Sequence, residues 1–134
     1  MWSNILKRVS KSKLVLKTSQ KNHSLKRLKE LFKKNNVLES IEFTGRQEDL
    51  KNHLITYNGI DIALDTFPYN GVTTSFEAIW MGVPVITMAG YNFNSRCGES
   101  INKNLNMERM VARDEDDYVY KVVNLSNNHD DYIK

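Results

Sequence analysis

Short apolar runs of the kind found in β-strands alternate along this chain with segments whose apolar residues recur every three or four positions, as in amphipathic helices. The run KLVLKT (13–18) predicts a strand, and the segment 22–36 predicts a helix that lysines close at its C-terminal end. One face of that helix carries Leu25, Leu28, Leu31 and Phe32. Another helix is expected from the start of the chain, with one apolar face made of Trp2, Ile5, Leu6 and Val9.

The same order of strand and helix repeats in the next part of the chain. IEFTG (41–45) predicts a strand, and the segment 46–59 predicts a helix that stops at Asn58-Gly59. The apolar residues of that helix stand at i, i+4 and i+7, and they are Leu50, Leu54 and Tyr57. IDIALDT (60–66) is apolar at nearly every central position, as a strand covered on both faces should be. We therefore expect this third strand in the middle of a sheet.

The remaining residues continue the alternation. Thr73 or Thr74 opens a helix that ends at Gly82, just before Pro84. Its expected inward face consists of Phe76, Ile79 and Trp80. Later elements are a strand at 84–90, a helix at 95–105, a short strand at 109–113 and a last helix, capped by Asp114, that presents Tyr118, Val122 and Leu125.

This order of elements predicts a fold class. Strands that alternate with helices through short loops are joined by right-handed parallel crossovers. We therefore expect an α/β fold with a Rossmann-like, doubly wound parallel sheet of about five strands. In such sheets, ligands collect beyond the C-terminal ends of the strands, in the loops that lead into helices.

Composition limits the class of protein. The chain has 134 residues, 40% of them hydrophobic, which suits a single domain covering residues 1–134. It has no apolar run of about eighteen residues and no signal-peptide pattern, so we expect a cytoplasmic protein with no membrane partner. Cys97 is the only cysteine, which excludes an internal disulfide within the chain and argues against a cysteine-based zinc site.

Charge is distributed unevenly. Residues 1–36 hold eleven Lys or Arg and one acid, a net charge of +10, whereas residues 37–134 hold eight basic and fifteen acidic side chains, a net charge of −7. A face that binds a polyanion is one interpretation. No aromatic or glycine-rich pattern interleaves the basic residues, however, so we favour a solvated helix face and expect no nucleic-acid partner.

The loop between the third strand and the next helix is the candidate site. Pro68 and Gly71 tighten the turn after Thr66, and the helix that follows begins with free N–H groups and the positive end of its dipole. Thr73 and Thr74 add hydroxyl donors for a phosphate, and a carboxylate one turn later, that of Glu77, suits ribose hydroxyls. Thr74 and Glu77 also have the spacing of a capping box, in which no ligand takes part.

Other polar residues are weaker candidates for a functional site. His23, His53 and His129 are too scattered to indicate a metal site, and we expect neither a metal nor a cofactor. Asp61 and Asp65 stand at opposite ends of one strand, about 13 Å apart, too far for a catalytic carboxylate pair. Ser95 and Arg96, at the next junction of loop and helix, are expected to support the loop.

The central motif DIALDTFPYNGVTTSFEAIWMGVPVITMAG, with SRCGES and ARDEDDYV after it, resembles the O-linked N-acetylglucosamine transferase and SPINDLY family of glycosyltransferases. The likeness covers nearly the whole chain. It implies the C-terminal, donor-binding lobe of a two-lobed (GT-B type) enzyme whose active site lies in the cleft between the lobes.

The resemblance assigns roles to particular residues. It implies that Thr73 and Thr74 hold the donor diphosphate and that Glu77 binds the ribose. Asn70 and Gly71 match the turn that brings the backbone to the phosphates. His53 matches a histidine near the nucleotide base; without the resemblance it would be a helix-surface imidazole.

Departures from the family pattern leave the base and sugar open. Val72 stands where the branch that uses uridine nucleotides carries a histidine, and Thr56 stands where that branch has an arginine. A UDP-sugar such as UDP-N-acetylglucosamine is the favoured donor, and a GDP-sugar remains an alternative. The catalytic N-terminal lobe and a phosphate-binding lysine upstream of Trp2 have no counterpart here.

We therefore expect a fragment that contains no catalytic residue and is inactive alone, because half a cleft leaves the reacting centre open to water. Its partners are the donor, the missing lobe and, in the full enzyme, a protein acceptor. An exposed apolar patch and self-association are also expected. The alternative function is a non-catalytic α/β module that makes protein–protein contacts.

Overall fold

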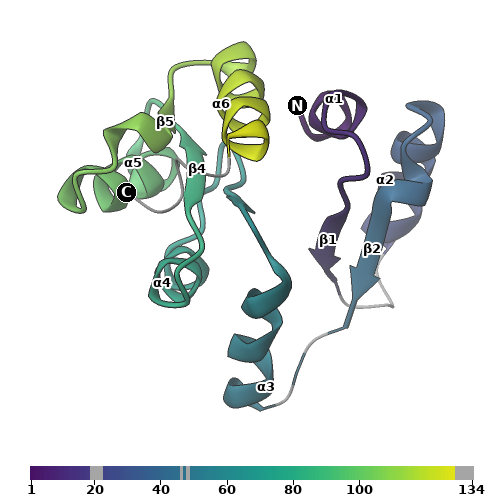
Figure 1. Cartoon of the computed structure of the whole chain (residues 1–134), viewed down its shortest axis with the longest axis horizontal. Helices are drawn as coiled ribbons and strands as arrows, with labels where there is room; N and C mark the ends of the chain where they lie inside the picture. Colours follow the sequence, from purple (N-terminus) through teal and green to yellow (C-terminus); the bar gives the residue numbers. More distant parts are fainter. Residues whose placement is uncertain (19–22, 46, 48, 129–134) are drawn as a thin grey trace.

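The structure is a computed structural model that describes residues 1–18, 23–45, 47 and 49–128. Helices and strands alternate along these residues (Figure 1), and some of the connections contain a short 3-10 turn. In chain order the elements are α1 (Trp2–Arg8), β1 (Leu14–Lys17), α2 (His23–Lys34), β2 (Ile41–Thr44), α3 (Leu50–Ile55), β3 (Ala63–Leu64), α4 (Thr73–Trp80), β4 (Val85–Met88), α5 (Cys97–Asn104), β5 (Val111–Ala112) and α6 (Glu115–Asn127).

All the strand pairs are parallel, and they fall into two hydrogen-bonded groups. Strand β1 pairs with β2, with Leu14 opposite Ile41. The second group has the order β3-β4-β5, with Ala63 opposite Val85. The expected α/β fold is confirmed, although the described strands form two hydrogen-bonded sheets and not one continuous sheet of five. In Figure 1 the β1–β2 pair with α2 lies apart from β4 and β5, with α1 beside α6.

The strand that is covered on both faces is β4, and not the third strand as the sequence predicted. Strand β3 is limited to Ala63–Leu64, and within the described residues it is hydrogen-bonded only to β4. Every residue of β4 is buried, because α4, α5 and α6 all contact this strand. Ile60, Ile62, Ala63 and Leu64 are only half-buried, so an apolar run of this kind does not by itself distinguish an edge strand from a central one.

The core of the three-stranded group is formed largely by α6. Tyr118, Val122 and Leu125 are buried as predicted, and they pack in one cluster with Ile86 of β4 and Ile5 of α1. The helix begins where the sequence predicted, since the carboxylate of Asp114 accepts the backbone N–H of Asp117 at 2.8 Å. Helix α1 therefore completes a core that belongs to the far end of the chain.

The inward face expected for helix α4 is confirmed only at Ile79, which is half-buried and packs against the cluster of Ala78, Val83 and Val85. The buried residues of the helix are the small Ser75 and Ala78, while Phe76 is 55% and Trp80 85% exposed. Small side chains let the helix approach the sheet closely, and the aromatic side chains of Phe76 and Trp80 lie on the outer face. The end of the helix was predicted correctly: Gly82 follows it with a φ of 80°, in the left-handed region that favours glycine.

Two other predicted apolar faces are only partly covered. In α2, Phe32 is buried and Leu31 is exposed, because a two-stranded sheet offers the helix a narrow surface. In α3, Leu50 is exposed and Leu54 is half-buried. Within the part of the chain that the structure describes, no helix is long and apolar enough to cross a membrane.

Candidate functional site

Asp65 anchors the loop that leads from β3 to α4. One carboxylate oxygen accepts the backbone N–H groups of Thr66 at 2.9 Å and Gly71 at 2.8 Å, and the other accepts the Thr87 hydroxyl at 2.7 Å. Burial raises the pKa of the Asp65 carboxyl, and these hydrogen bonds oppose that rise. The turn before α4 is therefore tied to β4, which carries Thr87.

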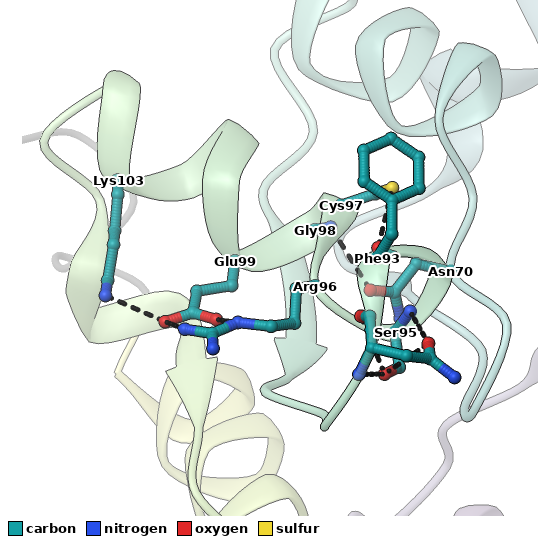
Figure 2. A network of polar contacts seen from close by, with 9 residues as sticks. Asn70, Phe93, Ser95, Arg96, Cys97, Gly98, Glu99 and Lys103 are labelled. Atoms are coloured by element: carbon teal, nitrogen blue, oxygen red, sulfur yellow. Dashed lines mark hydrogen bonds and ion pairs between the residues drawn. The ribbon is translucent and has the colours of Figure 1, made fainter.

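Asn70 holds the same turn from the other side. Its buried side chain donates to the carbonyl of Thr66 at 2.8 Å. It also accepts the backbone N–H of Gly98, at the start of α5, at 3.2 Å (Figure 2). Its own backbone N–H donates to the carbonyl of Asn94. The amide of Asn70 is thus used within the protein, where it joins the two loops that precede α4 and α5.

Gly71 packs closely against the first turn of α4. A Cβ atom at this position would lie 2.5 Å from the hydroxyl oxygen of Thr74 and 3.2 Å from that of Ser75. No side chain larger than a hydrogen fits without a shift. The glycine lets the turn pack directly against the first turn of α4.

The start of α4 has no side-chain cap. Val72 is the N-cap residue, and neither Thr73 nor Thr74 caps the helix through its hydroxyl. The capping-box interpretation of Thr74 and Glu77 is therefore wrong. The physical reason is position: Thr73 is the first helical residue, so Glu77 lies two residues beyond the place from which a capping-box carboxylate reaches back. The first N–H groups of the helix remain available to an acceptor.

The carboxylate of Glu77 contacts His53. The Nε2 atom of His53, on α3, lies 2.9 Å from Glu77 Oε2, and both side chains are largely buried. On the other side of the ring, Nδ1 lies 3.0 Å from the ammonium nitrogen of Lys17, at the end of β1. The ring of Tyr57 packs edge-on against the imidazole, and burial together with the charge of Glu77 raises the pKa of the Tyr57 phenol.

The loop before α5 is internally bonded. Asn92 and Ser95 form a capping box, so Ser95 supports the loop as predicted (Figure 2). Arg96 donates to both carboxylate oxygens of Glu99, at 2.7 and 3.1 Å, and Lys103 adds a contact at 2.8 Å. The hydrogen bonds from Arg96 and Lys103 hold the pKa of the Glu99 carboxyl below its ordinary value. Arg96 is thus engaged with its own helix.

The structure places the predicted residues in two neighbouring groups, one on the first turns of α4 and one in the turn that supports it. Thr73, Thr74 and Glu77 lie on the first turns of α4, and His53 contacts Glu77 from α3. Asn70 and Gly71 lie in the supporting turn. Sequence reasoning missed two residues, Asp65 as the loop anchor and Lys17 as the partner of His53. Both lie at or just beyond the C-terminal end of a parallel strand, and that position is the signal that could have found them.

The fold and the site define an α/β protein whose polar groups gather at the carboxyl ends of parallel strands, around an uncapped helix start. The model of glycosyl transferase family 41 matches residues 1–134. The chain therefore belongs to glycosyl transferase family 41, as the resemblance of its central motif indicated.

Individual relatives agree with this family. The chain is 35% identical to the probable UDP-N-acetylglucosamine–peptide N-acetylglucosaminyltransferase SPINDLY of Solanum lycopersicum, over 94% of this chain and 14% of that protein. The same values hold for the SPINDLY protein of Arabidopsis thaliana. Among solved structures, a mutant O-GlcNAc transferase of Thermobaculum terrenum is 32% identical with a TM-score of 0.92, covering 98% of this chain and 26% of that one. The chain thus spans about a seventh of the length of these curated relatives.

Proposed function

We propose that this chain is the donor-binding lobe of an enzyme that transfers a sugar from a nucleoside diphosphate to protein Ser or Thr. The names of the relatives, which describe UDP-N-acetylglucosamine–peptide transferases, support this proposal. Because the chain spans only a small part of those proteins, the acceptor and the catalytic groups are assigned to a second lobe. No residue of this chain is proposed as catalytic.

The uncapped start of α4 is the observation that carries the proposal. Its free N–H groups and the positive end of its dipole favour an anion, and Thr73 and Thr74 add two hydroxyl donors. We assign the donor diphosphate to this position. Asn70 and Gly71 serve it indirectly, since one braces the turn and the other lets the turn pack against the helix.

Glu77 and His53 are assigned to the nucleoside. The carboxylate of Glu77 contacts His53 and interacts with the Tyr57 phenol, and it has lone pairs enough to accept from the ribose hydroxyls as well. The His53 ring then lies beside the base. UDP is the favoured nucleotide because of the relatives' names, while Val72 and Thr56 keep GDP as the alternative.

Titration calorimetry with UDP and GDP tests the proposal directly. We expect binding of UDP at micromolar to millimolar concentration and weaker binding of GDP. The Glu77→Gln variant should bind UDP about 5- to 30-fold more weakly, a loss of about 1–2 kcal/mol, because a charged acceptor becomes neutral. Its thermal unfolding should hardly change, since Gln still accepts from His53. No heat with either nucleotide at millimolar concentration would contradict the proposal and favour a non-catalytic module.

A further inference from the structure

Lys17, His53 and Glu77 form a continuous line of polar contacts between the two hydrogen-bonded sheets. Lys17 ends β1, His53 lies on α3 and Glu77 lies on α4, which covers the three-stranded group. The contacts measure 3.0 Å between Lys17 Nζ and His53 Nδ1 and 2.9 Å between His53 Nε2 and Glu77 Oε2. The sequence separations of 36 and 24 residues make this line a product of the tertiary fold.

The chemistry of the two end groups determines the state of the ring between them. A lysine ammonium has three donors and no acceptor, so the contact at Nδ1 requires an unprotonated nitrogen there. A carboxylate accepts only, so Nε2 must carry the proton that it donates to Glu77. The arrangement fits the neutral Nε2–H form of His53, in which Nδ1 accepts from Lys17 and Nε2 donates to Glu77.

Glu77 alone would favour the positively charged imidazolium form of His53. A carboxylate at hydrogen-bond distance stabilises a positively charged imidazole, and the ion pair would be shielded here because His53 is 15% and Glu77 20% exposed. The Lys17 ammonium opposes that charge from the far side of the ring. Within the described residues, the groups that contact the ring include Lys17 from β1, Glu77 from α4 and the Tyr57 ring from the turn after α3.

We propose that Lys17 is a positioning residue of the nucleotide site, which keeps His53 neutral and leaves the negative charge of Glu77 available to the ligand. Lys17 does not need to touch the nucleotide for this effect. It acts by donating to Nδ1, which fixes the direction in which the ring donates. The consequence for nucleotide affinity rests on the proposed function, whereas the state of the ring does not.

Nuclear magnetic resonance of the histidine side chains tests the inference on the whole chain. In ¹⁵N-labelled protein at pH 7, long-range ¹H–¹⁵N correlations distinguish a neutral imidazole, with one nitrogen unprotonated, from an imidazolium. The His53 signals are assigned by their loss in His53→Gln. We expect the neutral Nε2–H form in the wild type and a mainly imidazolium signal in Lys17→Met. Lys17→Arg should restore the neutral form, because a guanidinium also only donates.

Lys13→Met is the matched control, because Lys13 is an exposed lysine just before β1 and should leave the His53 signals unchanged. An imidazolium in the wild type, or a neutral ring in Lys17→Met, would overturn the inference.

UDP affinity gives the second readout: Lys17→Met should bind about threefold to tenfold more weakly and Lys17→Arg about as well as the wild type. Weaker binding with an unchanged ring would make Lys17 a direct ligand and reject positioning. Absence of UDP binding by the wild type would reject the proposed function and leave the result on the ring standing.

Discussion

Asp65 shows how one buried carboxylate can shape a loop. It accepts two backbone N–H groups from its own loop and one hydroxyl from β4. The backbone carbonyl of the same residue accepts the phenol of Tyr118 from α6 at 2.9 Å. The turn that precedes the candidate phosphate seat is therefore fixed by β4 and α6, and not by the ligand.

Removal of this carboxylate should be costly. Asp65→Ala leaves two backbone N–H groups of the turn without an acceptor, and we expect a loss of about 3 kcal/mol in the free energy of unfolding. Asp65→Asn should lose only about 1 kcal/mol, because the amide oxygen still reaches those N–H groups. Urea unfolding measures both. The exposed Asp61→Ala is the control, and a loss in Asp65→Ala no larger than in this control would contradict the account.

Single residues also show what the sequence could and could not predict. The location of Thr73, Thr74 and Glu77 on one helix follows from local pattern and was predictable. The alternative interpretation of Thr74 and Glu77 as a capping box fails, because it depends on which residue precedes the helix, and that residue is Val72. The Lys17 partner of His53 was not predictable, since no local rule links residues so far apart in the chain.

Individual elements were predictable in kind and order, but the contact faces were not. The periodicity of α4 shows that Phe76 and Trp80 share a face, without showing whether that face lies inside. The sheet determined the result: the close approach of α4 to β4 selected Ser75 and Ala78. The buried face of helix α6 was predicted correctly. This helix has polar residues on one side and apolar residues on the other, so only one side can be buried, whereas α4 has apolar residues on more than one side.

Helix α5 supplies a prediction on pH. The hydrogen bonds from Arg96 and Lys103 lower the pKa of Glu99 in the folded protein. The stabilisation from these hydrogen bonds is therefore fully present above the ordinary glutamate pKa of about 4.3. It is lost as the pH falls through the lowered pKa of Glu99 in the folded protein. Glu99→Gln should therefore be about 1 kcal/mol less stable than the wild type at pH 7, with the gap closing near pH 3. Urea unfolding at both pH values measures the gap. Glu108→Gln, on an exposed side chain, is the control, and a Glu99→Gln gap that is equal at both pH values would contradict the assignment.

At the scale of the whole molecule, two hydrogen-bonded sheets are held together by side chains. Helix α1 packs against α6, and the line from Lys17 through His53 to Glu77 joins β1 to α4. Val72, Phe76 and Trp80 expose apolar side chains at the start of α4 and along it, and an apolar patch there stays a prediction. Self-association through that patch stays a prediction.

The central claim is that the uncapped start of α4 receives the diphosphate of a nucleotide. Calorimetric titration of UDP into the double variant Thr73→Val/Thr74→Val tests it most directly, because valine keeps the shape of threonine and removes only the hydroxyl. The hydroxyls do not cap the helix, so thermal unfolding of the unliganded variant should match the wild type. We predict about 30-fold weaker binding, which is about 2 kcal/mol for two lost hydrogen bonds. UDP affinity equal to that of the wild type, in a variant that unfolds at the same temperature, would contradict the claim.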